Sequence, residues 1–207
     1  MIVAAVILIP TYNEKENLGK LLESIFSLGI AGLSAIVIDD NSPDGTGELA
    51  EEFAKKYPVS VIKRPRKMGL GTAYVDGFKE ILRKAQDGPR YVVQMDADLS
   101  HDPKIIPAFL ERIKDHDVVL GSRYIAGGGI ENWDFFRRIV SKFGNTYASA
   151  VLGLPYRDLT GGFKCWRREA LEKLDLDCLS STGYNFQIET TYFAHKLGAK
   201  ICEIRVK

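Results

Sequence analysis

The tripeptide Asp96-Ala97-Asp98 stands at the end of a mainly apolar run, Tyr91 to Met95. Its two carboxylates point to the same side of an extended segment, because the side chains of a strand alternate with a period of two. Carboxylates this close repel each other unless a positive charge lies between them. Hard divalent cations such as Mg²⁺ or Mn²⁺ prefer oxygen ligands and are often shared with substrate phosphates. We therefore interpret Asp96 and Asp98 as candidate metal ligands, with a solvated acidic loop as the alternative.

Other apolar runs of the chain also end in clusters of polar residues. They are Val3 to Ile9 before Pro10-Thr11-Tyr12-Asn13-Glu14, Ala35 to Ile38 before Asp39-Asp40-Asn41-Ser42-Pro43-Asp44-Gly45, and Val118 to Leu120 before Gly121-Ser122-Arg123-Tyr124. A further short strand is expected at Val59–Ile62, and segments 18–26, 49–57, 74–82 and 105–113 show the periodicity of amphipathic helices. Apolar strands alternating with such helices predict an α/β fold with a mostly parallel sheet flanked by helices. Ligands of these sheets bind beyond the carboxyl ends of the strands, where the polar clusters lie.

The composition is that of an ordinary soluble protein, with 207 residues, 45% hydrophobic and 27% charged residues. A net charge of +1 provides no general attraction to nucleic acid, so we expect no such partner. Three cysteines without C-x-x-C spacing indicate reduced thiols and a cytosolic setting. No run approaches the roughly 18 apolar residues of a membrane span, and the segment Ile2–Pro10 lacks the basic region of a signal peptide.

The glycine-rich segment 69–74 does not match the known phosphate-binding fingerprints. It lacks the third glycine of the dinucleotide pattern, and the chain contains no G-x-x-x-x-G-K-[ST] sequence. The glycines indicate a tight loop that leads into a helix at Thr72. The basic cluster at 63–67 before them fits both anion steering and a solvated turn, so we assign it no role.

Aromatic and basic residues share a predicted helix after the glycines at 127–129. They are Trp133, Phe135, Phe136, Arg137, Arg138, Ile139, Val140, Lys142, Phe143 and Tyr147. Ser141 lies one turn after Arg137 on the same face, and Arg123 follows a predicted strand. The planar fork of arginine suits phosphate. Two interpretations of the helix stay open, namely a membrane-interface helix and a core helix whose arginines reach to solvent.

These motifs, in this order, resemble the inverting glycosyltransferases of the GT-A type, and most closely the dolichyl-phosphate or polyprenyl-phosphate mannose synthases. The segments Glu131-Asn132-Trp133 and Asp158-Leu159-Thr160-Gly161-Gly162-Phe163 add to the resemblance, which extends from residue 2 to about residue 206. It implies a GT-A type, Rossmann-like catalytic domain over residues 1–207, with a nucleotide-sugar half up to about residue 122 and an acceptor half from 123 to 207. The implied reaction is metal-dependent transfer of mannose from GDP-mannose to a dolichyl or polyprenyl phosphate with inversion, giving a β-mannosyl phosphate.

The resemblance also implies roles for individual residues. These are Pro10, Tyr12, Glu14, Ile38, Asp40, Asp96, Ala97, Asp98 and Leu120 for the nucleotide sugar; Asp96 and Asp98, with Ser100 as a weaker candidate, for Mg²⁺ or Mn²⁺; Arg123, Arg137 and Ser141 for the acceptor phosphate; and Asp96, Asp98 and Arg123 for catalysis. Two positions depart from the pattern. Ser100 and Asn185 stand where some relatives carry Gln and Lys, which weakens a third metal ligand and argues against a charged role at position 185.

The resemblance further suggests how the enzyme reaches its lipid acceptor. Relatives continue beyond the position of Lys207 into a basic segment, often followed by membrane helices. We therefore expect a longer natural chain, anchored by a missing C-terminal segment or by a small partner subunit. The expected location is the cytosolic face of a membrane, where the enzyme acts as a peripheral protein.

Three other functions fit parts of the sequence. The same fold would serve a polyprenyl-phosphate glucosyltransferase that uses UDP-glucose, and the residues around Asp40 do not distinguish guanine from uracil. A non-catalytic sugar-nucleotide-binding domain would not need the arginine–serine acceptor set. A phosphohydrolase is disfavoured, because its Asp-x-Asp motif normally follows the first strand, whereas here several strand–helix units precede Asp96.

Overall fold

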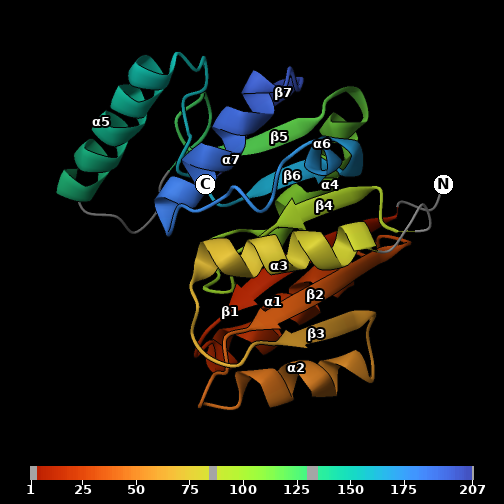
Figure 1. Ribbon diagram of the computed structural model, residues 1–207. Helices are drawn as coiled ribbons and strands as arrows, with labels where there is room; N and C mark the ends of the chain where they lie inside the picture. Colours follow the sequence, from red (N-terminus) through yellow and green to blue (C-terminus); the bar gives the residue numbers. More distant parts are fainter. Residues whose placement is uncertain (1–3, 84–87, 130–134, 207) are drawn as a thin grey trace.

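The computed structural model describes residues 4–83, 88–129 and 135–206, without the side chains of 135–138 (Figure 1). Its centre is a sheet in the order β3-β2-β1-β4-β6-β5-β7. The strands are β1 (Ala5–Thr11), β2 (Leu33–Asp39), β3 (Val59–Lys63), β4 (Tyr91–Gln94), β5 (Val118–Ser122), β6 (Lys164–Arg167) and β7 (Ile201–Arg205). All strand pairs are parallel except those of β6, which runs antiparallel to β4 and β5. The prediction of a mostly parallel sheet is confirmed.

Helices cover both faces of the sheet. They are α1 (Lys15–Ser27), α2 (Thr46–Ala54), α3 (Leu70–Arg83), α4 (Ile106–Arg112), α5 (Phe135–Leu152), α6 (Arg168–Glu172) and α7 (Tyr184–Lys196), with short 3-10 turns at Pro103–Ile105 and Ile113–Asp115. The alternation of side chains along β1 sends Ile7 and Ile9 into one core with α1, α2 and α4, and Leu8 into a second core with α3, α6 and α7. Both cores are apolar, so strands buried on both faces read as continuous hydrophobic runs.

Strand β6 was not expected from the sequence, because charged residues stand at both ends of its four-residue length. Inside the fold, Cys165 and Trp166 enter opposite cores, and the Trp166 indole donates to Gln94 on β4. Because β6 runs antiparallel, it begins at the edge where β4 and β5 end. The Asp158–Phe163 segment is thereby brought to the predicted site.

Helix α5 projects from one end of the molecule, apart from the helices that cover the sheet (Figure 1). Among the side chains of this helix that the structure describes, five large apolar ones are exposed: Ile139, Val140, Phe143, Tyr147 and Val151. The exposed fractions reach 71% for Phe143 and 64% for Tyr147. The interpretation of this segment as a core helix is therefore wrong for its described part. Trp133 lies outside the described residues.

Candidate functional site

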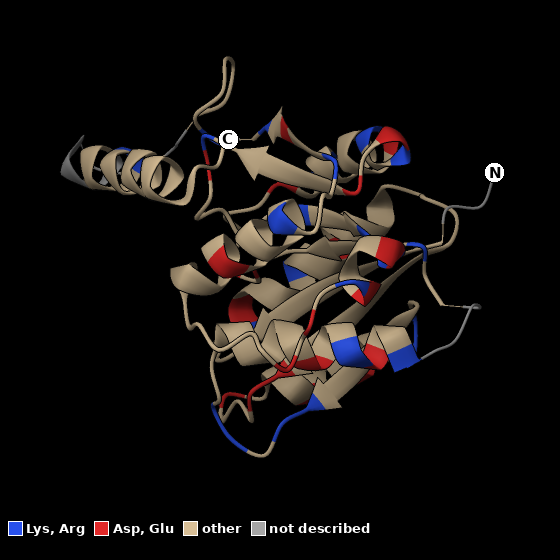
Figure 2. Ribbon diagram, turned by 45° about the horizontal axis from the view of Figure 1, so that its top comes forward, with Lys and Arg blue, Asp and Glu red and all other residues tan. Residues whose placement is uncertain are grey.

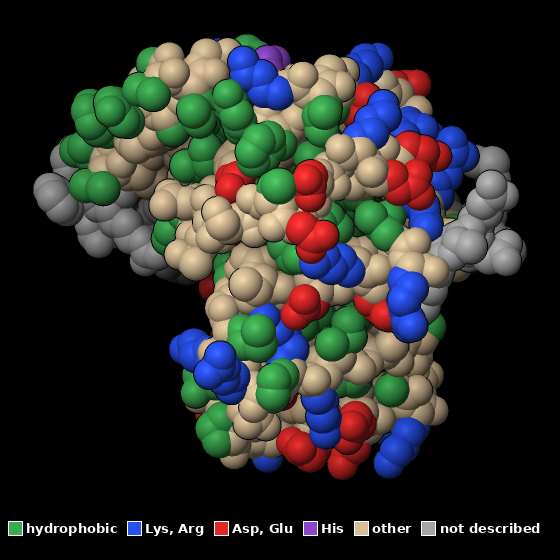
Figure 3. Space-filling view, viewed as in Figure 1, with side chains coloured by type: hydrophobic (Ala, Val, Ile, Leu, Met, Phe, Trp, Pro, Cys, Tyr) green, Lys and Arg blue, Asp and Glu red, His purple; other side chains and the backbone are tan. Residues whose placement is uncertain are grey.

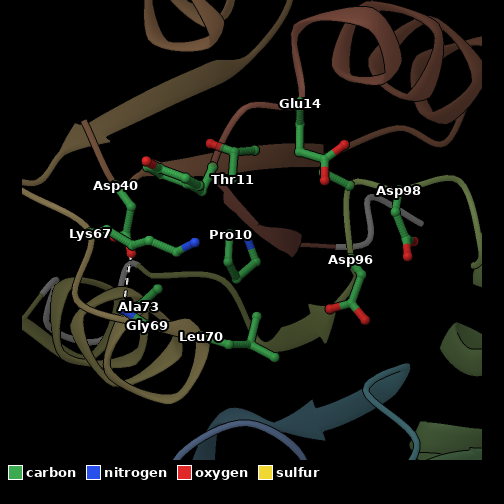
Figure 4. A pocket seen from close by; sticks show the side chains of 12 residues that line it. Pro10, Thr11, Glu14, Asp40, Lys67, Gly69, Leu70, Ala73, Asp96 and Asp98 are labelled. Atoms are coloured by element: carbon green, nitrogen blue, oxygen red, sulfur yellow. Dashed lines mark hydrogen bonds between the residues drawn. The ribbon is translucent and has the colours of Figure 1, made fainter. Parts of the chain in front are cut away.

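A cavity of about 270 Å³ opens at the carboxyl edge of β1, β2 and β4. Its lining residues are Pro10, Thr11, Tyr12, Glu14, Asp40, Lys67, Gly69, Leu70, Ala73, Asp96, Ala97 and Asp98. Asp40 and Lys67 lie at one end and the two aspartates, Asp96 and Asp98, at the other, with Pro10 between them (Figure 4). Seven of the residues expected to hold a nucleotide sugar thus line one cavity.

The loops after β1 and β2 are tied together by short polar side chains. The Asp39 carboxylate accepts from the Thr11 and Ser42 hydroxyls and from the Ser42 amide. The Thr46 hydroxyl accepts from the amide of Glu14, the residue before α1. Asn13 has a left-handed backbone with φ of 60°, which asparagine tolerates better than most residues. These bonds hold Tyr12 and Glu14 at the rim of the cavity.

Asp40 anchors the loop that contributes Lys67 and Gly69 to the cavity wall. Its carboxylate accepts from Arg64 Nη1 at 2.6 Å and from the amides of Met68 and Gly69 at 2.9 and 3.0 Å. Both charged side chains are almost completely buried. Lys67 lies in the loop that these bonds hold to Asp40, and its ammonium is 4.0 Å from the centre of the Tyr12 ring. The basic cluster at 63–67, to which the sequence analysis assigned no role, therefore supplies the Lys67 cation to the cavity wall. The position of its loop depends on the buried ion pair between Arg64 and Asp40.

The predicted metal ligands lie at the end of β4 in different surroundings. Asp96 Oδ1 accepts a hydrogen bond from the Tyr74 hydroxyl at 3.0 Å. Asp98 is exposed and accepts from the Ser100 amide at 3.0 Å across a turn in which Leu99 has φ of 63°. In the described ranges, no group of three or more His, Cys, Asp or Glu side chains is arranged to hold a metal. Two carboxylates still suit Mg²⁺ or Mn²⁺, because such cations commonly complete their shell with water and substrate phosphates.

His101 packs beneath the aspartates, with its ring stacked on Phe163 at 4.7 Å. Its Nδ1 accepts from the Asp96 amide at 3.0 Å. Burial lowers the pKa of His101, and an accepting Nδ1 requires the neutral ring. His101 therefore supports the backbone of the Asp96–Asp98 segment.

Arg123 lies where β5 ends and forms a double hydrogen bond with Asp158. Nε and Nη2 of Arg123 lie 2.7 and 2.8 Å from the carboxylate oxygens, and the Arg123 amide donates to the same group. The Asp158 side chain is 0% exposed, and Glu203 of β7 accepts from its amide. The ion pair fixes Arg123 at the sheet edge. Asp158 received no role from the sequence, although its motif was recognised.

The other residues expected to bind the acceptor phosphate, Ser141 and Arg137, belong to α5. The Tyr124 hydroxyl donates to Ser141 Oγ at 2.7 Å, so Ser141 lies beside the loop that carries Arg123. Asn145, one turn later on α5, accepts from the amides of Leu159 and Thr160 and ties the helix to the Asp158 segment. Arg137 belongs to α5, but its side chain lies outside the described residues.

Two residues expected around the nucleotide sugar lie beneath the cavity surface. The side chain of Ile38 on β2 is packed against α3, and Leu120 on β5 is buried in the same core. Ser100 is exposed and contributes its amide to the turn at Asp98. Their assigned roles stay predictions.

Lys164 on β6 is fully buried behind the site. Its ammonium donates to the carbonyl oxygen of Gln187 at 2.6 Å and to the Thr191 hydroxyl at 2.9 Å, both on α7. Burial lowers the pKa of Lys164 from 10.5 to about 7, against the opposing effect of Asp158. Between pH 7 and 10.5, Lys164 is therefore protonated in the unfolded chain and largely neutral in the folded chain. Because the unfolded state binds more protons in this range, the contribution of Lys164 to the free energy of unfolding rises with pH.

Lys164→Met tests this linkage. Relative to the variant, wild-type stability should increase by about 3 kcal/mol from pH 6 to pH 9, because the cost of the buried charge falls as Lys164 loses its proton. Urea unfolding across this pH range measures the difference. Lys20→Met, at an exposed lysine, is the control, and its free energy of unfolding should change with pH as that of wild type does. The same pH dependence in Lys164→Met and wild type would contradict the expectation.

The chain is similar to known proteins over most of its length. Residues 6–175 match the model of glycosyl transferase family 2. The chain is 41% identical over 203 residues to a polyprenol monophosphomannose synthase from Mycolicibacterium smegmatis, covering 97% of this chain and 75% of that protein. It is 39% identical over 204 residues to an undecaprenyl-phosphate mannosyltransferase from Micrococcus luteus, covering 96% and 81%.

Solved structures share the fold at lower sequence identity. Glucosyl-3-phosphoglycerate synthase from Mycobacterium tuberculosis, in complex with Mn²⁺, UDP and glucosyl-3-phosphoglycerate, matches with a TM-score of 0.70 at 19% identity. The match covers 99% of this chain and 69% of that chain. A mannosyltransferase from Pyrobaculum calidifontis, in complex with GDP-Man and Mn²⁺, matches with a TM-score of 0.67 at 17% identity, covering 99% and 56%. At these identities the likeness concerns the fold.

Proposed function

The chain belongs to glycosyl transferase family 2, and from that premise we propose that it transfers mannose from GDP-mannose to a polyprenyl phosphate with inversion at the sugar carbon. One observation carries the proposal. The Asp158–Phe163 segment holds Arg123 at one end and passes Asp96 at the other, where a Cβ added to Gly162 would lie 3.0 Å from Asp96 Oδ2. The group suited to an acceptor phosphate thus adjoins the carboxylates suited to a donor diphosphate.

In this proposal the cavity binds the donor. The nucleoside would bind at the end of the cavity with Asp40 and Lys67, whose ammonium lies over the Tyr12 ring, and the diphosphate would lie beside Asp96 and Asp98. A divalent cation bound there, Mg²⁺ or Mn²⁺, would act as a Lewis acid and stabilise the charge of the departing diphosphate. The 41% identical synthase and the metal-bound structures of the same fold support this assignment.

The acceptor explains why the site needs no strong general base. A phosphate monoester has a second pKa of about 6, so at neutral pH its oxygen already carries the attacking electron pair. The bond from that oxygen to the sugar C1 forms as the bond from C1 to the diphosphate oxygen breaks, and no proton has to be removed. Arg123 and Ser141 would orient the acceptor phosphate, and direct attack from the side opposite the diphosphate inverts the anomeric centre.

A thermal-shift panel with GDP- and UDP-sugars in the presence of Mn²⁺ tests the donor. Protection should follow RT ln(1 + [L]/Kd), and GDP-mannose should protect most. Labelled mannose should then appear in a lipid extract only when a polyprenyl phosphate is supplied. Stronger protection by UDP-glucose, with transfer of glucose, would replace the donor assignment. Binding of nucleotide without transfer to any phosphate acceptor would overturn the enzymatic proposal.

We further propose that α5 brings the enzyme to a lipid surface. Within the described ranges, no helix combines the length and apolarity that a membrane span requires. The exposed apolar side chains of α5 gather on one side of the molecule (Figure 3). The sequence of the helix contains basic residues, Lys142 among them, but no acidic residue, and no red segment interrupts it in Figure 2. Such a helix suits the interface of an anionic membrane, where a polyprenyl phosphate resides.

Phe143→Ser/Tyr147→Ser tests this surface. The variant should bind vesicles containing phosphatidylglycerol about tenfold more weakly, because two exposed aromatic side chains no longer enter the interface. Co-sedimentation with vesicles measures binding. Phe193→Ser/Leu197→Ser removes exposed apolar side chains on and beside α7 and is the matched control. Equal binding by the α5 variant and wild type would contradict the assignment.

A further inference from the structure

Tyr74 of α3 brings a buried hydroxyl to Asp96. Its side chain is 0% exposed and lies among aromatic rings, stacked against Phe186 at 5.9 Å and Phe78 at 6.3 Å. A phenylalanine would serve such packing equally well, but the Tyr74 hydroxyl lies 3.0 Å from Asp96 Oδ1. The phenolic O–H is the donor of this pair, because a carboxylate oxygen can only accept.

Asp96 is also enclosed from other directions. Its amide donates to His101 Nδ1, while Gly162 leaves room for Asp96 Oδ2, since an added Cβ would approach that oxygen to 3.0 Å. The position of Asp96 is therefore set by α3, by the turn that follows β4 and by the segment before β6. Asp98 differs, because in the described part of the chain its carboxylate accepts from the amide of Ser100, within its own turn.

We propose that Tyr74 is a positioning residue, whose hydroxyl holds the Asp96 carboxylate in one orientation toward the cavity so that it is ready for a divalent cation. This inference rests on the proposed function. A ligand held in advance loses less conformational freedom on binding, and outer partners of metal ligands typically account for 10–100-fold in metal affinity. Asp98, with local contacts, would complete the site after the cation and phosphates arrive.

The test uses Tyr74→Phe, which keeps the ring stack and removes the oxygen. Mn²⁺ is titrated in the presence of saturating GDP, and free Mn²⁺ is followed by electron paramagnetic resonance. The Kd for Mn²⁺ should rise about tenfold or more. Tyr156→Phe is the matched control, because it removes another hydroxyl from the same core, one that contacts His195 at 3.0 Å away from the aspartates. Its Mn²⁺ affinity should equal that of wild type.

A double-mutant cycle with Asp96→Asn separates positioning from general packing. If Tyr74 acts through Asp96, Tyr74→Phe should have no further effect on Mn²⁺ binding in the Asp96→Asn background. Wild-type Mn²⁺ affinity in Tyr74→Phe, or an equal loss in Tyr156→Phe, would overturn the inference alone. Failure of the wild-type protein to bind Mn²⁺ with GDP would overturn the metal assignment of the proposed function, and the inference with it.

Discussion

Asp98→Asn should lower the rate of mannosyl transfer about a thousandfold while the unfolding temperature stays close to that of wild type. The side chain is exposed and its described hydrogen bond is local, so the amide fits the same space. The loss follows from chemistry, because the proposed cation loses a charged oxygen beside the departing diphosphate. Turnover is measured with radiolabelled donor at saturating Mn²⁺.

Ser100→Ala provides the comparison within the same turn. It leaves the amide that donates to Asp98 and removes the hydroxyl of the weaker metal candidate. We expect activity within about twofold of wild type, since water readily replaces such a ligand on Mg²⁺. A loss as large as that of Asp98→Asn would make Ser100 a ligand. Wild-type turnover in Asp98→Asn would contradict the proposed role of Asp98 as a metal ligand.

Arg123→Met should reduce both stability and use of the acceptor. It leaves the carboxylate of Asp158 buried without its guanidinium partner, and breaking a buried ion pair in this way costs about 3 kcal/mol or more. It also removes the cation proposed to bind the acceptor phosphate. We expect kcat/KM for a polyprenyl phosphate to fall about a hundredfold or more, with GDP affinity unchanged by calorimetry.

The double variant Arg123→Met/Asp158→Asn separates these two effects. An uncharged amide at position 158 still accepts from the backbone amide of residue 123, so much of the lost stability should return. The acceptor phosphate still lacks its cation, so turnover should stay low. Recovery of turnover together with stability would show that Arg123 has a structural role and no direct part in acceptor binding.

The strands and most helices were predictable because their signals are local. Strands such as β1 and β2 are buried on both faces and therefore read as continuous apolar runs, and α1 shows helical periodicity because one face is buried. Strand β6 gave no such signal. Its partners, β4 and β5, lie far away in the sequence, and Lys164 is buried by contacts with α7 that no local pattern encodes.

The α/β class, the polar edge of the sheet and the Asp96–Asp98 pair could be predicted from the sequence, since they follow from side-chain periodicity and residue type. The residues that support this pair became visible only in the folded chain. Tyr74 reaches Asp96 from 22 positions earlier and Asp158 reaches Arg123 from 35 positions later. The outward orientation of the apolar face of α5 is likewise a property of the folded chain. Such pairings depend on which elements pack together, a property of the whole chain that neither spacing nor local propensity specifies.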